Sequence, residues 1–104
     1  MDSLNNIYLF FHQSMSTIET IVTKAFDDQK PGTSGLRKPT KTFLKENYVE
    51  NFVQSIFNAI GESLHGRTLV VGGDGRFHMK ECVETITKMA AANKVFFAMF
   101  KYFL

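Results

Sequence analysis

The sequence contains no tryptophan, only two prolines and a single cysteine, Cys82. One cysteine excludes an intramolecular disulfide and fits a reducing compartment, so we predict a cytoplasmic chain in which Cys82 is a packed, inert thiol. Apart from Cys82, the side chains that commonly bind zinc are three histidines far apart in the sequence, His12, His65 and His78. A zinc site is therefore not expected. The carboxylates do not cluster either, so we predict no magnesium ligands and no metal site in this chain.

Long apolar runs and a strong charge of either sign are also missing. The net charge of +2 argues against a nucleic-acid-binding protein whose affinity depends on bulk charge. The apolar runs at 7–11 and 95–104 are too short for a signal-peptide core and for a membrane span, respectively. With 44% apolar and 21% charged residues, the 104-residue chain fits one globular domain with no nucleic-acid or membrane partner.

The stretch Lys30-Pro31-Gly32-Thr33-Ser34-Gly35-Leu36-Arg37-Lys38 combines glycines, hydroxyls and cations. Its glycines allow free backbone N–H groups to form a concavity that binds an anion. Lys30, Arg37 and Lys38 add positive charge, and an arginine can grip a phosphate with two hydrogen bonds. The stretch predicts a phosphate-binding loop; the alternative is a basic surface turn. It is not a P-loop, because that motif has four residues between its glycines.

The residue patterns predict an α/β fold. Thr17–Phe26 is rich in β-branched residues and predicts a strand near 18–25, and Lys41–Leu44 predicts a short second strand. Apolar residues recur every three or four positions over 47–64 and 78–93, which predicts two helices. Asn47, followed by Glu50, is expected to cap the first helix with its side chain.

Thr68–Val71 is a continuous apolar run that predicts a strand at 68–72, covered on both faces. The order strand, helix, strand, glycine-rich turn, helix predicts parallel pairing, with ligands outside the carboxyl ends of the strands. This places the turn of Asp74, Gly75 and Arg76 at the rim, where Asp74 and Arg76 either orient a ligand or pair with each other.

Two further side chains are weighed as catalytic groups. An imidazole such as that of His78 can act as a general base, but a surface histidine at a helix start is the simpler interpretation. Ser34 lacks a predicted histidine or aspartate partner that would activate it as a nucleophile.

The two ends of the chain are interpreted separately from its middle. We interpret Met15 as a natural start, so that 1–14 is an appended leader predicted to be disordered; a frayed tail of the domain is the alternative. The domain is then expected to cover 15–93. Residues 94–104 are an apolar tail, either a final strand or a continued helix, that favours aggregation if exposed.

Lys30–Lys38 and Leu69–Phe77 together resemble the first domain of eukaryotic phosphoglucomutase, in the α-D-phosphohexomutase family. The first motif is specific to that family. The helix that contains Asn51–Ile56 and the segments 79–81 and 90–93 also resemble it, so the resemblance covers about 15–93.

The resemblance implies a four-domain, magnesium-dependent enzyme that interconverts glucose 1-phosphate and glucose 6-phosphate through a phosphoserine and a bisphosphate intermediate. It implies a three-layer α/β/α domain with a mixed sheet, here incomplete. The family's Thr-Ser-Gly-Leu-Arg loop lines the catalytic cleft, so Thr33, Ser34 and Arg37 carry over as catalytic-site residues. Arg37 is expected to contact the bisphosphate, and Lys38 beside it to bind substrate. Ser34 does not match the family's phosphorylated serine.

Several family motifs have no counterpart in the sequence: Thr-Ala-Ser-His-Asn-Pro with the phosphoserine, the Asp-Gly-Asp-Gly-Asp-Arg metal loop, the Gly-Glu-Glu-Ser sugar loop and the distal phosphate loop. After Asn93 the family continues with a glycine-containing turn and a strand, whereas this chain reads Lys94-Val-Phe-Phe. We interpret the chain as a truncated N-terminal part of the first domain, inactive alone, with a divergent tail at 94–104 that is unrelated to the family. It is expected to carry no cofactor, although magnesium and glucose 1,6-bisphosphate are implied for the full-length family.

Two other functions remain open from the sequence. One is a small module that holds a phosphosugar or another anion through Lys30, Arg37 and Lys38. The other is an interaction protein whose phenylalanine-rich tail recruits a partner. A missing strand after Asn93 would also leave a sheet edge unpaired and favour self-association through that edge or through the apolar tail.

Overall fold

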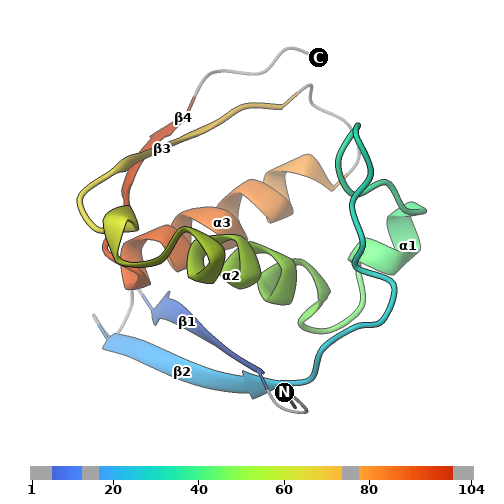
Figure 1. Cartoon of the computed structure of the whole chain (residues 1–104), viewed down its shortest axis with the longest axis horizontal. Helices are drawn as coiled ribbons and strands as arrows, with labels where there is room; N and C mark the ends of the chain where they lie inside the picture. The colour runs from blue at the N-terminus through green and yellow to red at the C-terminus, as the bar shows by residue number, and fades with distance from the viewer. Residues whose placement is uncertain (1–5, 13–16, 74–77, 100–104) are drawn as a thin grey trace.

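The computed structural model describes residues 6–12, 17–73 and 78–99, with side chains over 7–12, 17–73 and 78–96. Two helices lie between two pairs of strands (Figure 1). None of the described helices has the length and apolar character needed to cross a membrane. In chain order the elements are β1 (Asn6–His12), β2 (Thr17–Thr23), α1 (Thr40–Phe43), α2 (Tyr48–Ile60), the 3₁₀ helix η1 (Gly61–Leu64), β3 (Thr68–Val71), α3 (Met79–Ala92) and β4 (Phe96–Met99).

Antiparallel and parallel pairing both occur, in separate sheets. β1 and β2 are antiparallel, whereas β3 and β4 are parallel, with Thr68 opposite Phe96. The helix α3 supplies the crossover that a parallel pair requires. The α/β class is confirmed, and the chain is an incomplete α/β/α domain. The expected mixed sheet is wrong for the described residues, because the antiparallel and the parallel pair belong to two separate sheets. The parallel partner of β3 is β4 and not the strand at 17–23, which pairs with β1 instead.

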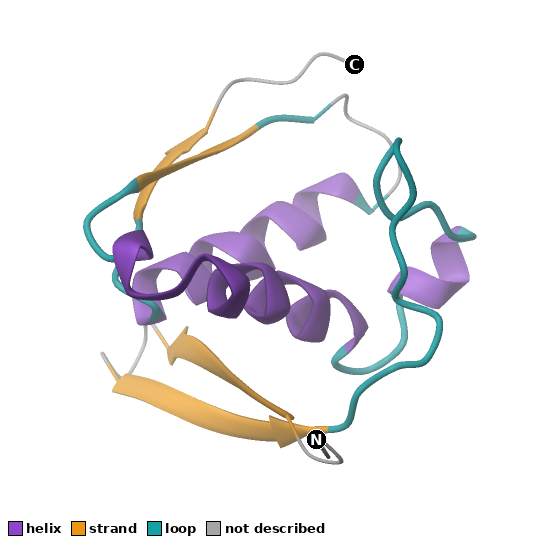
Figure 2. Ribbon diagram, in the orientation of Figure 1, coloured by secondary structure: helices purple, strands orange, loops and turns teal. Residues whose placement is uncertain are grey.

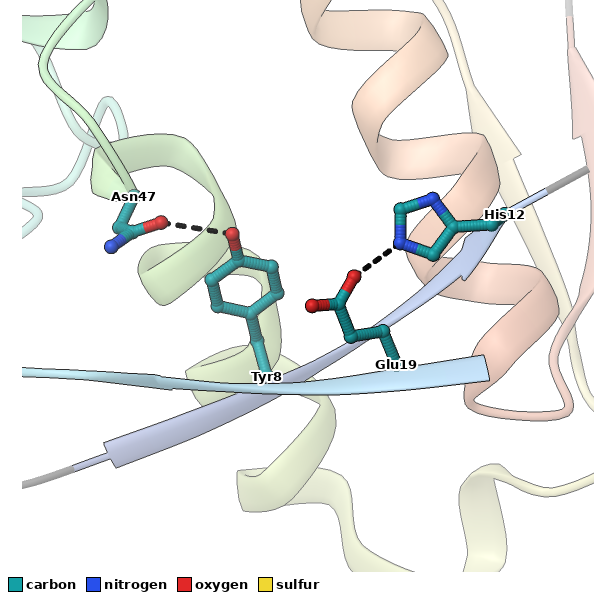
Figure 3. A network of polar contacts seen from close by, with 4 residues as sticks. All are labelled: Tyr8, His12, Glu19 and Asn47. Atoms are coloured by element: carbon teal, nitrogen blue, oxygen red, sulfur yellow. Dashed lines mark hydrogen bonds and ion pairs between the residues drawn. The ribbon is translucent and has the colours of Figure 1, made fainter. Parts of the chain in front are cut away.

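The expectation that 1–14 is a disordered leader is wrong for residues 6–12, because they form β1. Tyr8 is only 5% exposed, and its hydroxyl donates a hydrogen bond of 2.8 Å to Asn47 Oδ1 (Figure 3). His12 and Glu19 link β1 to β2 on the same sheet (Figure 3). The apolar run that is too short for a signal peptide is therefore long enough for an edge strand that packs on both helices.

The expectation that the strand after Asn93 is missing is also wrong, because Phe96–Met99 forms β4 beside β3. Val95 is 6% exposed and belongs to the core. β3 is not covered on both faces: Leu69 packs against the core, whereas Val70 is 53% exposed. Self-association through a sheet edge or through the apolar tail at 94–104 stays a prediction, which sedimentation at rising protein concentration tests.

Two local predictions fail at the turn into α2. The segment at 41–44 is not a strand: Lys41–Phe43 belong to the single-turn helix α1, and Leu44 follows its last residue. Pro39 precedes α1, and its carbonyl accepts a hydrogen bond from the Thr42 N–H. Asn47 directly precedes α2 as expected, but it has φ +67 and makes no side-chain capping bond. Its side-chain oxygen is used by Tyr8 instead. Tertiary contact thus replaces the local cap.

The core lies where both helices meet β1 and the start of the β3–β4 pair. The apolar faces predicted for the two helices supply most of it. The outer part of the first face stays exposed, since Ile56 and Ile60 are 45% and 50% exposed. The buried cluster consists of Tyr8, Val53, Phe57, Leu64, Met89, Ala90 and Val95.

Candidate phosphate-binding site

The stretch 30–38 forms a tight hairpin loop. Gly32 and Gly35 form a β-bridge: the N–H of each donates to the carbonyl of the other, and both N···O distances are 3.1 Å. Thr33 and Ser34 form the tip, and neither has a positive φ. The chain reversal is completed at Gly35, whose φ of +89° is a conformation that glycine adopts at little cost.

The cations of the loop line a cavity of about 320 Å³ with the hairpin. The side chains of Lys30 and Arg37 are exposed and that of Lys38 is half-buried. No hydrogen bond or ion pair joins Arg37, Lys30 or Lys38 to any other residue that the structure describes. Their charges are therefore available to an anion in the cavity. The full lining is Lys30, Gly32, Thr33, Ser34, Gly35, Arg37 and Lys38.

The loop stands at the end of the molecule where α2 and α3 both begin and toward which β3 runs (Figures 1 and 2). Helix N-termini carry partial positive charge, but the first turns of α2 and α3 carry Glu50 and Glu81, so the cations of the loop itself are what favours an anion here. The sequence predicted a ligand at the carboxyl ends of the strands, and the loop lies at that end. Asp74, Gly75 and Arg76, which were also assigned to this rim, fall outside the described residues.

A polar network holds the base of the loop against α2. Gln29 Nε2 donates to the Tyr48 carbonyl at 2.6 Å, and the Tyr48 hydroxyl donates to Asp28 Oδ1 at 3.0 Å. Asn51 Nδ2 donates to Gln29 Oε1 at 3.3 Å. Sequence reasoning missed all four residues. The available signal was weak: Tyr48 and Asn51 are one helical turn apart on one face, and Asp28 and Gln29 directly precede the loop.

The other catalytic candidates, Ser34 and His78, lie in different surroundings. No hydrogen bond joins Ser34 Oγ to a described residue, so nothing in that part of the chain activates it as a nucleophile. His78 directly precedes α3, and its Nδ1 lies 3.6 Å from Glu81 Oε1. Burial raises the pKa of the Cys82 thiol, and the charges of Glu81 and Glu50 raise it further. A raised pKa disfavours the thiolate, which is the reactive form of cysteine.

Two larger cavities are less suited to a phosphate. One, of about 390 Å³ between β1, α2 and the start of α3, is lined by three glutamates, Glu46, Glu50 and Glu81, and by one lysine, Lys45, so negative charge predominates and disfavours an anion. The other, of about 400 Å³ beside η1, has mainly apolar walls, and its Arg67 Nε already donates to the Ser63 carbonyl. Charge therefore singles out the smaller cavity at the loop.

The described residues offer no obvious place for a metal. Among them, no group of three or more histidine, cysteine, aspartate or glutamate side chains is placed to hold an ion. The ligand set that the resemblance implies for magnesium is thus not met by this part of the chain, and we assign no chemical step to a metal here.

Sequence comparison adds independent evidence. The sequence model for phosphoglucomutase/phosphomannomutase, alpha/beta/alpha domain I, matches residues 28–103. This range includes the hairpin loop, both long helices and the tail beyond residue 93, which therefore is not foreign to the family.

Curated relatives agree with the family match. Phosphoglucomutase 1 of Drosophila melanogaster is 58% identical over 79 residues, or 76% of this chain. The cytoplasmic phosphoglucomutase of Pisum sativum is 54% identical over 83 residues, or 79% of the chain, and the phosphoglucomutase of Rhizobium radiobacter is 57% identical over 75 residues, or 72%. In each case the chain spans 14% of the relative's length. By its sequence, its helices and its basic hairpin, the chain belongs to the phosphoglucomutase/phosphomannomutase family through its alpha/beta/alpha domain I.

Proposed function

We propose that residues 30–38 form one phosphate-contacting wall of a phosphoglucomutase cleft. In this proposal Arg37 and Lys38 bind a phosphate of glucose 1-phosphate, glucose 6-phosphate or glucose 1,6-bisphosphate. Thr33 and Ser34 line the cleft and approach the ligand through backbone N–H groups and hydroxyls. The names of the relatives and the specific loop motif support this substrate class, and a cytoplasmic location follows the relatives from Pisum sativum and Solanum tuberosum that are named cytoplasmic.

One observation carries the proposal: the loop residues that the motif assigns to phosphate all line a single cavity, and its cations have no described partner. A phosphate dianion placed there would gain charge-assisted hydrogen bonds without first breaking an existing ion pair. Charged hydrogen bonds of this kind contribute roughly 1.5–3 kcal/mol each.

Calorimetric titration with glucose 1,6-bisphosphate tests the assignment. We expect Arg37→Ala to weaken binding by about tenfold or more, because it removes a charge-assisted and bidentate contact. Arg67→Ala is the matched control: it removes the same charge from the segment between η1 and β3, at the other end of the molecule (Figure 1). If both variants weaken bisphosphate binding equally, the effect comes from net charge alone, and the loop assignment is refuted.

The 104 residues alone are expected to bind but not to turn over substrate. Phosphoryl transfer needs a nucleophile and electrostatic clamps in one geometry, and the loop supplies only the clamp. Arg37 stabilises negative charge but does not accept a phosphoryl group. A coupled assay for glucose 6-phosphate, with magnesium and glucose 1,6-bisphosphate, should give the rate of the protein-free blank. Turnover that disappears in Arg37→Ala would contradict this expectation.

A further inference from the structure

The two chain segments that flank the phosphate loop converge on one side chain, Tyr48. Tyr48 is the first residue of α2 and is 0% exposed. Before the loop, Phe26 packs edge-on against the Tyr48 ring, with the ring centroids 4.8 Å apart. After the loop, Phe43 of α1 packs against the same ring at 5.9 Å. Both bases of the loop are thereby fixed to the N-terminus of one long helix.

Polar contacts from Tyr48 continue into the residues next to the loop. Its hydroxyl donates to Asp28 Oδ1, and its carbonyl accepts from Gln29 Nε2. Gln29 immediately precedes Lys30, the first residue of the loop. Asn51, one turn further along α2, donates to the side-chain oxygen of Gln29. Tyr48 therefore holds Asp28 and Gln29 through two bonds and two different groups.

The Tyr48 hydroxyl is suited to this role because it stays protonated. Burial raises the pKa of Tyr48, and the hydrogen bond and negative charge of Asp28 raise it further. A protonated hydroxyl donates to the carboxylate, and a charge-assisted bond of this kind is directional. The exposed side of the loop has no comparable anchor: the tip is held only by the bridge between Gly32 and Gly35 within the described residues.

We propose that Tyr48 is a positioning residue that fixes the base of the 30–38 loop and so presets Arg37 for phosphate. The inference rests on the proposed function for its ligand, but the ordering of the loop is measurable without any ligand. A preset loop loses less conformational entropy on binding than a loose one. Removing the hydroxyl should therefore loosen the loop first and weaken phosphate binding as a consequence.

The first test compares amide hydrogen exchange in the full chain and in Tyr48→Phe, which keeps the ring and removes the hydroxyl. We expect the Gly32 and Gly35 amides, which form the bridge, to exchange at least about fivefold faster, with Val53 and Phe57 in α2 unchanged. Tyr8→Phe is the matched control, because it also removes a buried tyrosine hydroxyl bonded near the start of α2. Unchanged exchange in the loop, or equal acceleration at all four amides, would overturn the inference.

The second test uses Asp28→Ala, which removes the acceptor of the Tyr48 bond and leaves the buried ring in place. Asp28 carries a negative charge beside a basic loop, so a purely electrostatic role predicts tighter binding of glucose 1,6-bisphosphate in this variant. Positioning predicts the opposite, a Kd that rises severalfold in both Asp28→Ala and Tyr48→Phe.

The two tests separate this inference from the proposed function. Weaker binding in Arg37→Ala together with unchanged or tighter binding in Asp28→Ala would contradict the role of Tyr48 and leave the phosphate loop intact. If the unaltered chain binds no bisphosphate, the proposed function fails, and the exchange rates of Gly32 and Gly35 alone decide whether Tyr48 orders the loop.

Discussion

Gly35 is the residue on which the hairpin backbone depends most. Its φ is +89°, and a Cβ at this position would meet no atom within 4 Å, so a substitution would strain the backbone without a steric clash. Gly32 across the bridge has equally open surroundings and no positive φ. The two glycines therefore form a matched pair that separates backbone strain from loss of space.

We expect Gly35→Ala to destabilise the hairpin by about 1–2 kcal/mol, the usual cost of a left-handed conformation for an L-residue. Gly32→Ala should leave the hairpin close to unchanged. Exchange of the Gly32-to-Gly35 bridge amides and the affinity for glucose 1,6-bisphosphate measure the difference. Equal effects of the two substitutions would show that the positive φ is not what the loop needs.

Tyr8 makes the stability of the chain sensitive to alkaline pH. Burial raises the pKa of Tyr8 to about 12, and the charges of Glu50, Glu19 and Glu46 add to this effect. The unfolded chain has a tyrosine pKa near 10. Since the folded pKa is the higher one, the stability from neutral Tyr8 is complete below pH ~10 and is lost as pH rises toward ~12.

Urea denaturation at several pH values checks this prediction. The urea concentration at the unfolding midpoint should decrease as the pH is raised from ~10 to ~12. This decrease should be smaller in Tyr8→Phe, because phenylalanine has no proton to lose. The same slope in both proteins would mean that Tyr8 does not contribute to the alkaline loss.

At the scale of elements, Gln54 joins three parts of the fold. Its Oε1 accepts from the Leu9 N–H of β1 and from Asn93 Nδ2 after α3, both at 3.1 Å. Its Nε2 donates to Asn93 Oδ1 at 2.9 Å. Gln54 is 6% exposed and sits in α2, so these bonds are shielded from water. They connect β1 to α2 and to the end of α3.

Gln54→Ala should lower the free energy of unfolding by roughly 2–3 kcal/mol, because it leaves buried partners without hydrogen bonds. Asn58→Ala is the control, since Asn58 is exposed and its side chain accepts a bond from the same Gln54. Its loss should stay within about 0.5 kcal/mol, as for most surface substitutions. Chemical denaturation of both variants gives the comparison. A small effect of Gln54→Ala would mean that β1 packs by apolar contact alone.

The sequence predicts the elements whose signals are local. The apolar repeat of α2 and α3 places both helices correctly because each buries one stripe against the other elements. Gly32, Gly35 and the cations around them identify the loop, because turn chemistry and charge are readable without a fold. The apolar run also identifies β3, although one face of this strand is exposed and not covered as expected.

Features that depend on distant partners escaped prediction. β1 is a strand only because 17–23 and the two helices lie beside it. α1 was mistaken for a strand because four residues carry too little periodicity to separate the two structures. The loop anchor was missed because Tyr48 has the pattern of an ordinary helix residue, and only the fold places Asp28 at its hydroxyl. Tertiary contacts therefore decide β1 and the loop anchor, whereas α1 is too short for its local signal to be read.

On the scale of the whole molecule, positive and negative side chains line different cavities. The net charge is only +2, yet the loop cavity is lined by Lys30, Arg37 and Lys38. The cavity between β1 and the two helices is lined by three glutamates and one lysine, Lys45. Of these two cavities, the loop cavity is therefore the favourable one for a phosphate, and the small net charge of the chain does not indicate it.

Mapping of glucose 1,6-bisphosphate on the folded chain by amide chemical shifts tests this account most directly. The account predicts shifts at the amides of Gly32, Thr33, Ser34, Gly35 and Arg37, which saturate with the bisphosphate and disappear in Arg37→Ala. It would be contradicted by saturating shifts centred on the glutamate-lined cavity, or by a loop whose amides do not move while the bisphosphate binds elsewhere.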